Sequence, residues 1–130
     1  MLVNQVCIKE KENRSIKVSD YQYKSDRGKP KLHLVPTKIL PAIARVREYG
    51  SRKYPKGGED NWKLVDNAEE RYIDALLRHT LQFVDDRYGN DDESGLPHLW
   101  HMCTNIAFLC ELLEDKFEPD YSREINDDNK

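Results

Sequence analysis

One apolar stretch that carries two histidines constrains the fold more than any other part of the chain. It spans residues 93–111 and reads ESGLPHLWHMCTNIAFLCE. His98, His101 and Asn105 recur at i, i+3 and i+7, which places them on one stripe of a helix. Apolar side chains surround that stripe nearly all round, so we expect this helix to be largely buried. Buried imidazoles and amides are costly unless each finds a partner, so the stripe needs a metal, a ligand or a satisfied hydrogen-bond network.

Charge and composition narrow the class of protein. The 130 residues carry a net charge of -3, which gives no electrostatic reason to expect nucleic acid or an anionic membrane as a partner. No apolar run approaches the length of a membrane span, and the N-terminus lacks the layout of a secretory signal, so we expect a cytoplasmic protein. Only 38% of the residues are apolar. A monomer would therefore have a thin core, and we expect a homo-oligomer.

Hydrophobic periodicity predicts a mainly α fold with a three-helix core. The predicted helices span about residues 37–50, 66–86 and 97–114. Gly50 is expected to end or kink the first of them, because glycine commonly follows the last helical residue. Asp66 or Asn67 is expected to cap the second helix. We expect oligomerisation to complete this core.

Changes in composition divide the chain into three parts. Residues 1–27 are polar with two short β-branched runs, which suit either a β-hairpin or a flexible arm. Residues 28–115 hold all the helical periodicity and would form a helical nucleotide-binding or hydrolase domain. Residues 116–130 are predicted to be an acidic, flexible tail.

The segment between the first two helices, residues 50–62, is rich in glycine, cations and aromatic side chains. Such a loop could lie over a ligand, with Lys53 for phosphate and Tyr54 or Trp62 for a base. It lacks the G-x-x-x-x-G-K-[ST] pattern, which excludes a P-loop. The alternative is a basic surface loop with Trp62 anchored in the core.

Antiparallel packing would bring the histidines of two helices together. A short connector joins the second and third helices, so His79 should face His98 and His101. Glu93, together with Asp91 or Asp92, would sit at the same end. Imidazole and carboxylate suit Mn²⁺, Fe²⁺, Co²⁺ or Zn²⁺, whereas Mg²⁺ prefers oxygen alone. Two alternatives stay open, a metal-free site and histidines that are satisfied core residues.

Short motifs follow one another between residues 28 and 113. They are Gly28-Lys29-Pro30, Leu34-Val35-Pro36, Tyr49-Gly50, Lys53-Tyr54, Asn61-Trp62, Arg71-Tyr72, Leu76-Leu77-Arg78-His79 and Glu93-Ser94-Gly95-Leu96-Pro97-His98-Leu99 with His101 and Asn105. In this order they resemble a family of small phage-type proteins, the dATP/dGTP diphosphohydrolases or their N-terminal domain. The resemblance implies a mostly helical protein that removes pyrophosphate from purine deoxynucleoside triphosphates with the help of a divalent metal.

The carboxylates of the broader all-α nucleotide pyrophosphohydrolases are matched only approximately. That set, Glu-x-x-Glu with Glu-x-x-Asp, would hold Mg²⁺. The nearest candidates here are Glu69, Glu70 and Asp74 on one helix and Glu111, Glu114 and Asp115 on another. This departure favours an alternative function, a non-catalytic module that sequesters a nucleotide such as a signalling nucleotide. A third alternative is a structural oligomer with a satisfied histidine network.

Taken together, the residues and the resemblance predict a metal-dependent hydrolase that removes pyrophosphate from purine (deoxy)nucleoside triphosphates such as dATP and dGTP. The residues expected in catalysis are Glu93, His98 and Arg78. Those expected to bind substrate are Lys53, Tyr54, Asn61, Trp62 and Asn105. Those expected to bind metal are His79, Glu93, His98 and His101. Mg²⁺ or Mn²⁺ is the favoured ion, with Zn²⁺ or Co²⁺ as alternatives.

Overall fold

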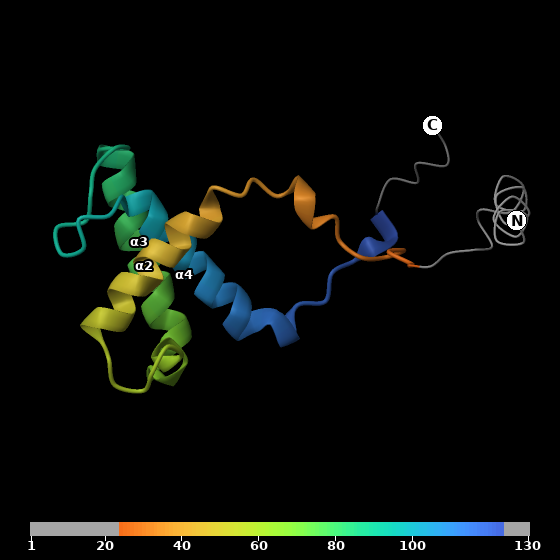
Figure 1. Ribbon diagram of the computed structural model, residues 1–130, viewed down its shortest axis with the longest axis horizontal. Helices are drawn as coiled ribbons and strands as arrows, with labels where there is room; N and C mark the ends of the chain where they lie inside the picture. The colour runs from red at the N-terminus through yellow and green to blue at the C-terminus, as the bar shows by residue number, and fades with distance from the viewer. Residues whose placement is uncertain (1–23, 124–130) are drawn as a thin grey trace, which may run out of the picture. The chain divides into compact units, whose positions relative to one another are not determined.

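Three α-helices dominate the structure, as the sequence predicts. The computed structural model describes residues 24–123, which divide between two units with the boundary between Val35 and Pro36. The helices all belong to the second unit and are α2 (Ile39–Lys53), α3 (Ala68–Asp85) and α4 (His98–Leu113) (Figure 1). No helix in the described part combines the length and the apolar character needed to cross a membrane. The predicted N-terminal β-hairpin lies outside the described residues.

Short 3-10 turns connect and flank the helices. They are η2 (Leu32–Leu34), η3 (Asn61–Leu64), η4 (Glu114–Lys116) and η5 (Tyr121–Arg123). Both η4 and η5 fall in or beside the segment predicted as a flexible tail, so part of that segment has local structure. In residues 24–123 there is no strand, and the β-type pairing is one isolated antiparallel bridge between Asn90 and Pro97.

The first helix is longer than predicted. Gly50 lies inside α2, and the helix continues for one more turn to Lys53, where the Tyr54 amide donates to the Gly50 carbonyl at 2.9 Å. Gly50 therefore does not end the helix, although glycine is about 1 kcal/mol less favourable than alanine in a helix interior. The extra turn places Lys53 on a helix rather than in a loop.

The start of α3 also differs from the prediction. Asn67 occupies the N-cap position, but its backbone is left-handed with φ of 53°, and its side chain makes no capping hydrogen bond. Glu69 and Glu70 lie in the first turn, where carboxylates interact favourably with the helix dipole. Asparagine tolerates left-handed angles better than most residues, so Asn67 acts through its backbone rather than through its side chain.

A tightly bonded connector, residues 86–97, reverses the chain between α3 and α4. The Asp91 amide donates to the Leu96 carbonyl at 2.8 Å, and the Gly95 amide donates to the Asp91 carbonyl at 2.8 Å. Gly95 has φ of 71°, an angle that favours glycine. The His98 amide donates to the Gly89 carbonyl at 3.2 Å. These bonds hold Asp91 beside the first turn of α4.

The interior of the helical unit is unusually polar. The apolar side chains buried below 10% exposure are those of Ala42, Val46 and Trp62. The buried polar side chains are all on α4 and are those of His98, His101, Thr104 and Asn105. Because α4 packs against both α2 and α3, its polar stripe faces the centre of the unit. The prediction that His98 and His101 are buried is therefore confirmed.

Candidate functional site

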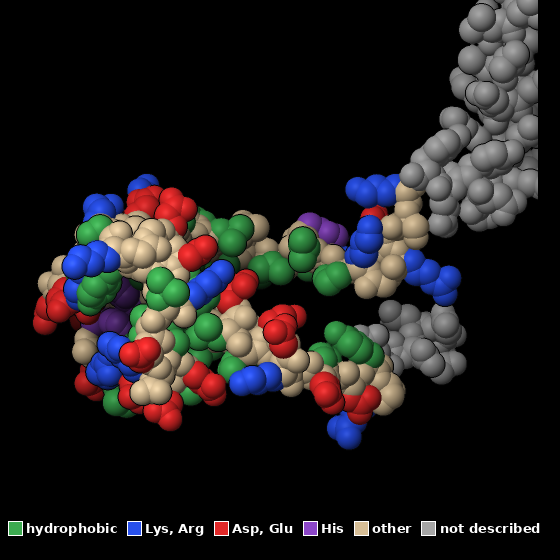
Figure 2. Space-filling view, turned by 90° about the horizontal axis from the view of Figure 1, so that it is seen from below, with side chains coloured by type: hydrophobic (Ala, Val, Ile, Leu, Met, Phe, Trp, Pro, Cys, Tyr) green, Lys and Arg blue, Asp and Glu red, His purple; other side chains and the backbone are tan. Residues whose placement is uncertain are grey.

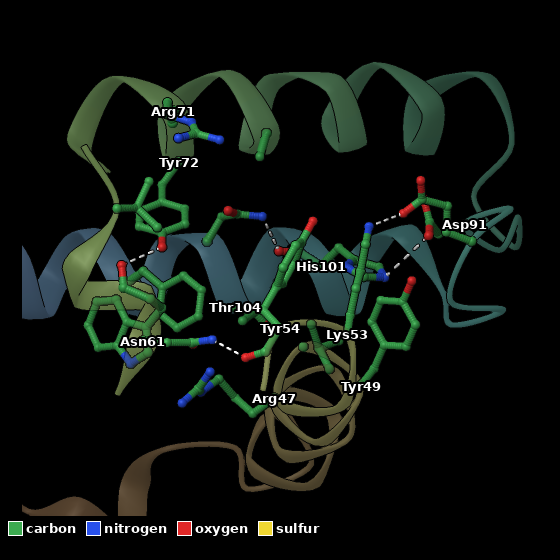
Figure 3. A pocket seen from close by; sticks show the side chains of 18 of the residues that line it. Arg47, Tyr49, Lys53, Tyr54, Asn61, Arg71, Tyr72, Asp91, His101 and Thr104 are labelled. Atoms are coloured by element: carbon green, nitrogen blue, oxygen red, sulfur yellow. Dashed lines mark hydrogen bonds and ion pairs between the residues drawn. The ribbon is translucent and has the colours of Figure 1, made fainter. Parts of the chain in front are cut away.

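A large pocket lies within the helical unit. It lies between α2, α3, α4 and the connector, and its volume is about 850 Å³. Ligand sites for small molecules usually fall between about 300 and 1,000 Å³. In Figure 2, histidine side chains are visible inside a hollow of this unit, with lysine and arginine side chains nearby. Figure 3 shows that the pocket has two ends of different character.

Aromatic side chains form the first end. Trp62 stacks on Phe108 with ring centroids 4.3 Å apart, and Tyr72 packs against Phe108 at 4.9 Å. The Tyr72 hydroxyl donates to the Trp62 carbonyl at 2.5 Å. Arg47 lies above the Phe108 ring at 5.3 Å, and its guanidinium also donates to the Glu59 carbonyl. This end offers flat apolar surface with two arginines, Arg47 and Arg71, beside it.

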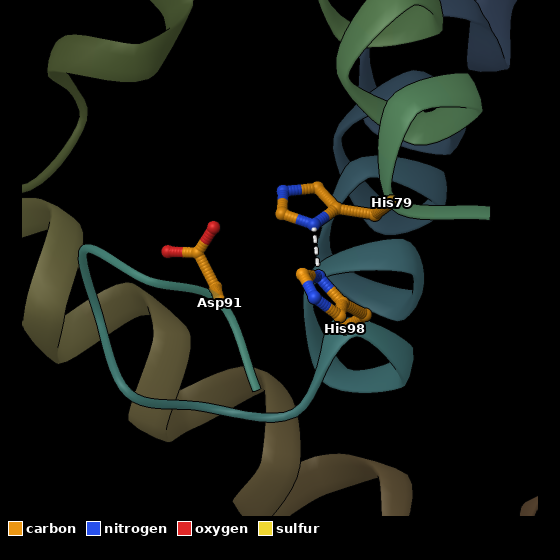
Figure 4. Close-up of side chains that lie close together, drawn as sticks. All are labelled: His79, Asp91 and His98. Carbon is orange, nitrogen blue, oxygen red and sulfur yellow. Dashed lines mark hydrogen bonds between the residues drawn. The ribbon is translucent and has the colours of Figure 1, made fainter. Parts of the chain in front are cut away.

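Histidines and an aspartate form the second end. His79 Nδ1 lies 3.0 Å from His98 Nδ1, and the His79 and His101 rings stack with centroids 4.4 Å apart. Asp91 faces the same space from the connector, as Figure 4 shows. His101 Nε2 lies 2.7 Å from the Ser94 hydroxyl and 3.9 Å from Asp91 Oδ2. The predicted convergence of the three histidines is present in the structure.

Burial and neighbouring charges keep two of these imidazoles neutral. Burial, reinforced by the neighbouring His101, lowers the pKa of His79 to about 4, although Asp91 opposes this shift. Burial also lowers the pKa of His101. Burial alone would raise the pKa of Asp91, but hydrogen bonds from the Ser94 amide and hydroxyl bring its pKa below the usual value. At neutral pH this end therefore presents neutral imidazoles and a carboxylate, which is the protonation state that binds metal ions.

Glu93, which was predicted to join the histidines, pairs with a lysine instead. Its carboxylate pairs with Lys53 at the mouth of the pocket, and its side chain is 67% exposed. The hydrogen bond to Glu93 raises the pKa of Lys53, and one to Tyr54 adds to the effect. The carboxylate that faces His79 and His98 is instead that of Asp91. Asp91 lies two residues before Glu93, so the sequence alone could not decide between them.

The other predicted site residues also line the pocket, except His98. Arg78, Tyr54, Asn61 and Asn105 all line it, and Tyr54 is 59% exposed. The Asn61 amide donates to the Tyr54 carbonyl, and the Asn105 amide donates to the His101 carbonyl at 2.8 Å. Trp62 is buried in the aromatic cluster, which matches the interpretation of Trp62 as a core anchor. His98 lies just behind the lining, next to His79.

Two features of the site were not expected from the sequence. Arg47 is not among the residues that the sequence motifs indicated for the site, but it lines the pocket and lies over Phe108. The approximate carboxylate set on α3, α4 and η4 lies outside the pocket, and its members are exposed: Glu69, Glu70, Asp74, Glu111, Glu114 and Asp115. The pocket therefore contains histidines and Asp91 in place of the several carboxylates that would hold Mg²⁺ in the broader family.

Acidification should destabilise the fold through His79. The pKa of His79 is about 4 when folded and 6.5 for an ordinary histidine, so the unfolded chain binds more protons between these values. The free energy of unfolding should then fall as the pH drops from 7.5 to 4.5, by about 1–2 kcal/mol after allowing for partial exposure. Urea unfolding of the wild type and of His79→Gln measures this. Parallel pH curves for the two proteins would contradict it.

The sequence of the chain matches a family of known proteins. Residues 19–121 match the family described as dATP/dGTP diphosphohydrolase, N-terminal. A protein of Salmonella phage PMBT28 named dATP/dGTP diphosphohydrolase is 34% identical over 93 residues, which cover 72% of this chain. Those residues span only 30% of the phage protein. No solved structure matches the chain.

The fold and the pocket define a small all-α protein with a nucleotide-sized cavity. The match over residues 19–121 identifies its family, and the chain belongs to the dATP/dGTP diphosphohydrolase N-terminal family. This confirms the resemblance that the sequence motifs indicate.

Proposed function

We propose that the pocket binds a purine deoxynucleoside triphosphate and that the chain hydrolyses it to the monophosphate and pyrophosphate with a divalent metal. The observation that carries this proposal is the two-ended pocket, with an aromatic end and an end of histidine, aspartate and cations. A nucleotide has the same division, since its base is flat and apolar and its phosphates are anionic. The name of the phage relative supports the choice of substrate.

Two cations on different helices can bind the phosphates. Lys53 lies on the last turn of α2, Arg78 lies on α3, and both line the pocket. Phosphoryl transfer depends mainly on positioning and on neutralising charge. Lys53 is held by Glu93 at the pocket mouth, so an incoming phosphate would compete with that carboxylate for the lysine.

An exposed aromatic ring can bind the base. Tyr54 is 59% exposed and lines the pocket, whereas Trp62 is buried against Phe108. Stacking of a base on an aromatic ring contributes about 1–3 kcal/mol. We therefore assign base stacking to Tyr54, whose ring lies beside Lys53, so that a stacked nucleotide would have its phosphates near that cation.

Hydrolysis at the α-phosphorus fits the histidine end. Water oxygen would bond to the α-phosphorus, the bond from phosphorus to the bridging oxygen would break, and pyrophosphate would leave. The neutral imidazole of His101 could accept the proton of the attacking water, because Ser94 fixes its orientation. A divalent ion, when bound, supplies positive charge near the phosphates and promotes ionisation of water. His79, His98 and Asp91 are the residues suited to hold it.

Pyrophosphate release from the four deoxynucleoside triphosphates tests the proposal. With Mn²⁺ or Mg²⁺ present, dATP and dGTP should release pyrophosphate at least about tenfold faster than dCTP and dTTP, since a purine offers more stacking surface. EDTA should stop the reaction. Folded protein that releases no pyrophosphate from any of the four, with either metal, would overturn the proposal.

The exposed carboxylates support a second candidate function, which is sequestration without hydrolysis. The set that holds Mg²⁺ in the broader all-α pyrophosphohydrolases would have Glu69, Asp74 and Glu111 among its nearest counterparts, and these lie outside the pocket. A sequestering module would bind the nucleotide and leave it intact. A rise in melting temperature with dGTP, without pyrophosphate release, would favour this second function.

Substitution of Lys53 should weaken substrate binding. Lys53→Met removes a cation that lines the pocket but keeps a side chain of similar length. We expect KM for dGTP to rise about tenfold, which corresponds to about 1.4 kcal/mol of lost interaction. Steady-state kinetics measure this. Lys38→Met, at the N-terminal end of α2 and away from the pocket lining, is the matched control and should leave KM unchanged.

A further inference from the structure

Three potential metal ligands from two helices and the connector meet at one point. His79 comes from α3, His98 from the first turn of α4 and Asp91 from the connector. One ligand atom from each residue lies within 4.8 Å of the other two. Figure 4 shows the two rings and the carboxylate turned toward a shared space. The group therefore has the separations that a single ion could bridge with small side-chain adjustments.

The distance between the two imidazoles matches a shared ion. His79 Nδ1 and His98 Nδ1 are 3.0 Å apart. Two nitrogen ligands of one ion, each at about 2.0–2.1 Å, are separated by roughly 3.0–3.4 Å across an octahedral or tetrahedral edge. A hydrogen bond between neutral rings has the same length, but that bond does not require a carboxylate beside it. Asp91 supplies the anionic partner that a cation needs.

Neighbouring groups fix the ligands in place. The Ser94 amide donates to Asp91 Oδ2 at 2.9 Å, and the Asp91 backbone is bonded to Leu96 and Gly95. His101 stacks on His79 and contacts the Ser94 hydroxyl. Such supporting contacts orient metal ligands and raise affinity. In addition to its proposed role as proton acceptor, His101 thus supports the position of His79 in this centre.

The geometry points to a centre of two histidines and one carboxylate, His79, His98 and Asp91, that binds Mn²⁺, Co²⁺ or Zn²⁺ in preference to Mg²⁺. Imidazole ligands suit these transition ions, whereas Mg²⁺ favours oxygen. Three protein ligands leave coordination positions free for phosphate oxygen and water. The role of the ion rests on the proposed function, but ion binding itself needs no nucleotide.

Titration of the full chain with single metal salts tests this centre. After EDTA treatment and dialysis, MnCl₂, CoCl₂, ZnCl₂ and MgCl₂ are added separately and the melting temperature is recorded. Transition ions at a hundredfold excess over Kd should add about 2.7 kcal/mol of stability, which raises the melting temperature by several degrees. Mg²⁺ at the same concentration should raise it by less than about 1 °C. Absence of a shift with all three transition ions would overturn the proposal.

Substitutions identify the ligands. Asp91→Asn and His98→Gln should each weaken Co²⁺ binding by at least about tenfold, measured by calorimetry and by the visible absorption of Co²⁺. Asp92→Asn is the matched control, because Asp92 is exposed and outside the pocket. Asp91 lies in a connector, so its variant should fold even if His98→Gln does not. Unchanged Co²⁺ binding in Asp91→Asn would place the ion elsewhere.

Failure of the metal centre and failure of the proposed function give different results. Transition ions that bind through Asp91, with no pyrophosphate release, would retain the centre and exclude the hydrolase. Pyrophosphate release with Mg²⁺ and no binding of transition ions would retain the hydrolase and exclude the centre.

A second inference concerns the apolar face of the α3 and α4 pair. Its exposed side chains are Ile73, Leu77, Leu81 and Val84 on α3 and Leu99 and Ile106 on α4. The four residues on α3 recur at i, i+4, i+8 and i+11, which places them on one stripe of that helix. The two residues on α4 are seven positions apart, which also places them on one side of their helix. At about 100° per residue, these positions lie roughly 150° around their helices from His79 and His101 in the pocket. These side chains therefore lie on the outer sides of α3 and α4, turned away from the pocket.

We infer that a second copy of this chain covers this apolar face. The six side chains expose on the order of 600 Å², close to the ~800 Å² that each partner of a standard interface buries and larger than most apolar patches of monomers. A twofold axis would pack two antiparallel helix pairs into a four-helix bundle. Few apolar side chains are buried in the described residues, namely Ala42, Val46 and Trp62. This thin core also favours association, because a dimer would bury more apolar surface.

Light scattering after size-exclusion chromatography tests the interface. The full chain should elute at twice its mass of 15.3 kDa, and Leu77→Glu should elute at the monomer mass. Leu77 is 55% exposed, so its replacement should not unfold the chain. Leu40→Glu on α2, which is 65% exposed and outside this face, should remain dimeric. A wild-type monomer at 50 µM, or a dimer in both variants, would contradict the inference.

Discussion

Replacing Asp91 by Asn is expected to lower kcat/KM for dGTP by on the order of 1,000-fold, because the change removes the one carboxylate that faces His79 and His98. Asparagine has the same shape and can still accept a hydrogen bond from the Ser94 amide. The connector should therefore keep its conformation, and circular dichroism should match the wild type. Steady-state kinetics with Mn²⁺ measure the loss.

Two neighbouring substitutions separate the role of Asp91 from a general effect of charge. Asp92→Asn removes an adjacent, exposed carboxylate and should leave kcat/KM within about twofold. Glu93→Gln breaks the pair with Lys53 and tests the predicted catalytic role of Glu93. If Asp91→Asn retained wild-type kcat/KM while Glu93→Gln lost it, the carboxylate assignment would be reversed.

Replacing Trp62 by Ala is expected to destabilise the fold by about 3–5 kcal/mol. Trp62 stacks on Phe108, contacts Tyr72 edge-on, and is one of three apolar side chains buried in the described residues. Domains of this size are stable by only about 5–15 kcal/mol, so the variant should be close to unfolding at room temperature. The urea midpoint of the variant measures this change.

Tyr54→Ala is the matched comparison for Trp62→Ala. Tyr54 is 59% exposed at the pocket, so its loss should cost less than about 0.5 kcal/mol of stability. It should instead weaken nucleotide binding by about 1–3 kcal/mol. A stable Trp62→Ala protein that had lost nucleotide affinity would show that Trp62, rather than Tyr54, stacks on the base.

Most of the fold could be predicted from periodicity. The three helices appear within about three residues of the predicted bounds, because apolar spacing reports the face that packs. Gly50 was misleading, since a glycine signals a helix end only when the chain uses its left-handed angles, and α2 does not. Asn67 does adopt a left-handed angle, whereas the sequence predicted that Asp66 or Asn67 would cap α3 through its side chain.

The candidate site could be predicted only in part. Antiparallel packing was enough to bring His79 to His98 and His101, because helix direction follows from a short connector. The choice of Asp91 depends on hydrogen bonds inside the connector, and these have no signature in a run of three acidic residues. Arg47 has no sequence signal that marks it for the site, because a charge on a helix is usually exposed, but the pocket brings it over Phe108.

Oxygen-18 tracing of the reaction tests the central claim most directly. The full chain is incubated with dGTP and Mn²⁺ in water enriched in oxygen-18, and the products are analysed by mass spectrometry. Water that attacks the α-phosphorus should leave one labelled oxygen in dGMP and an unlabelled pyrophosphate. Label in pyrophosphate or inorganic phosphate, or intact dGTP after incubation with folded protein, would contradict the claim that this pocket hydrolyses the nucleotide at its α-phosphorus.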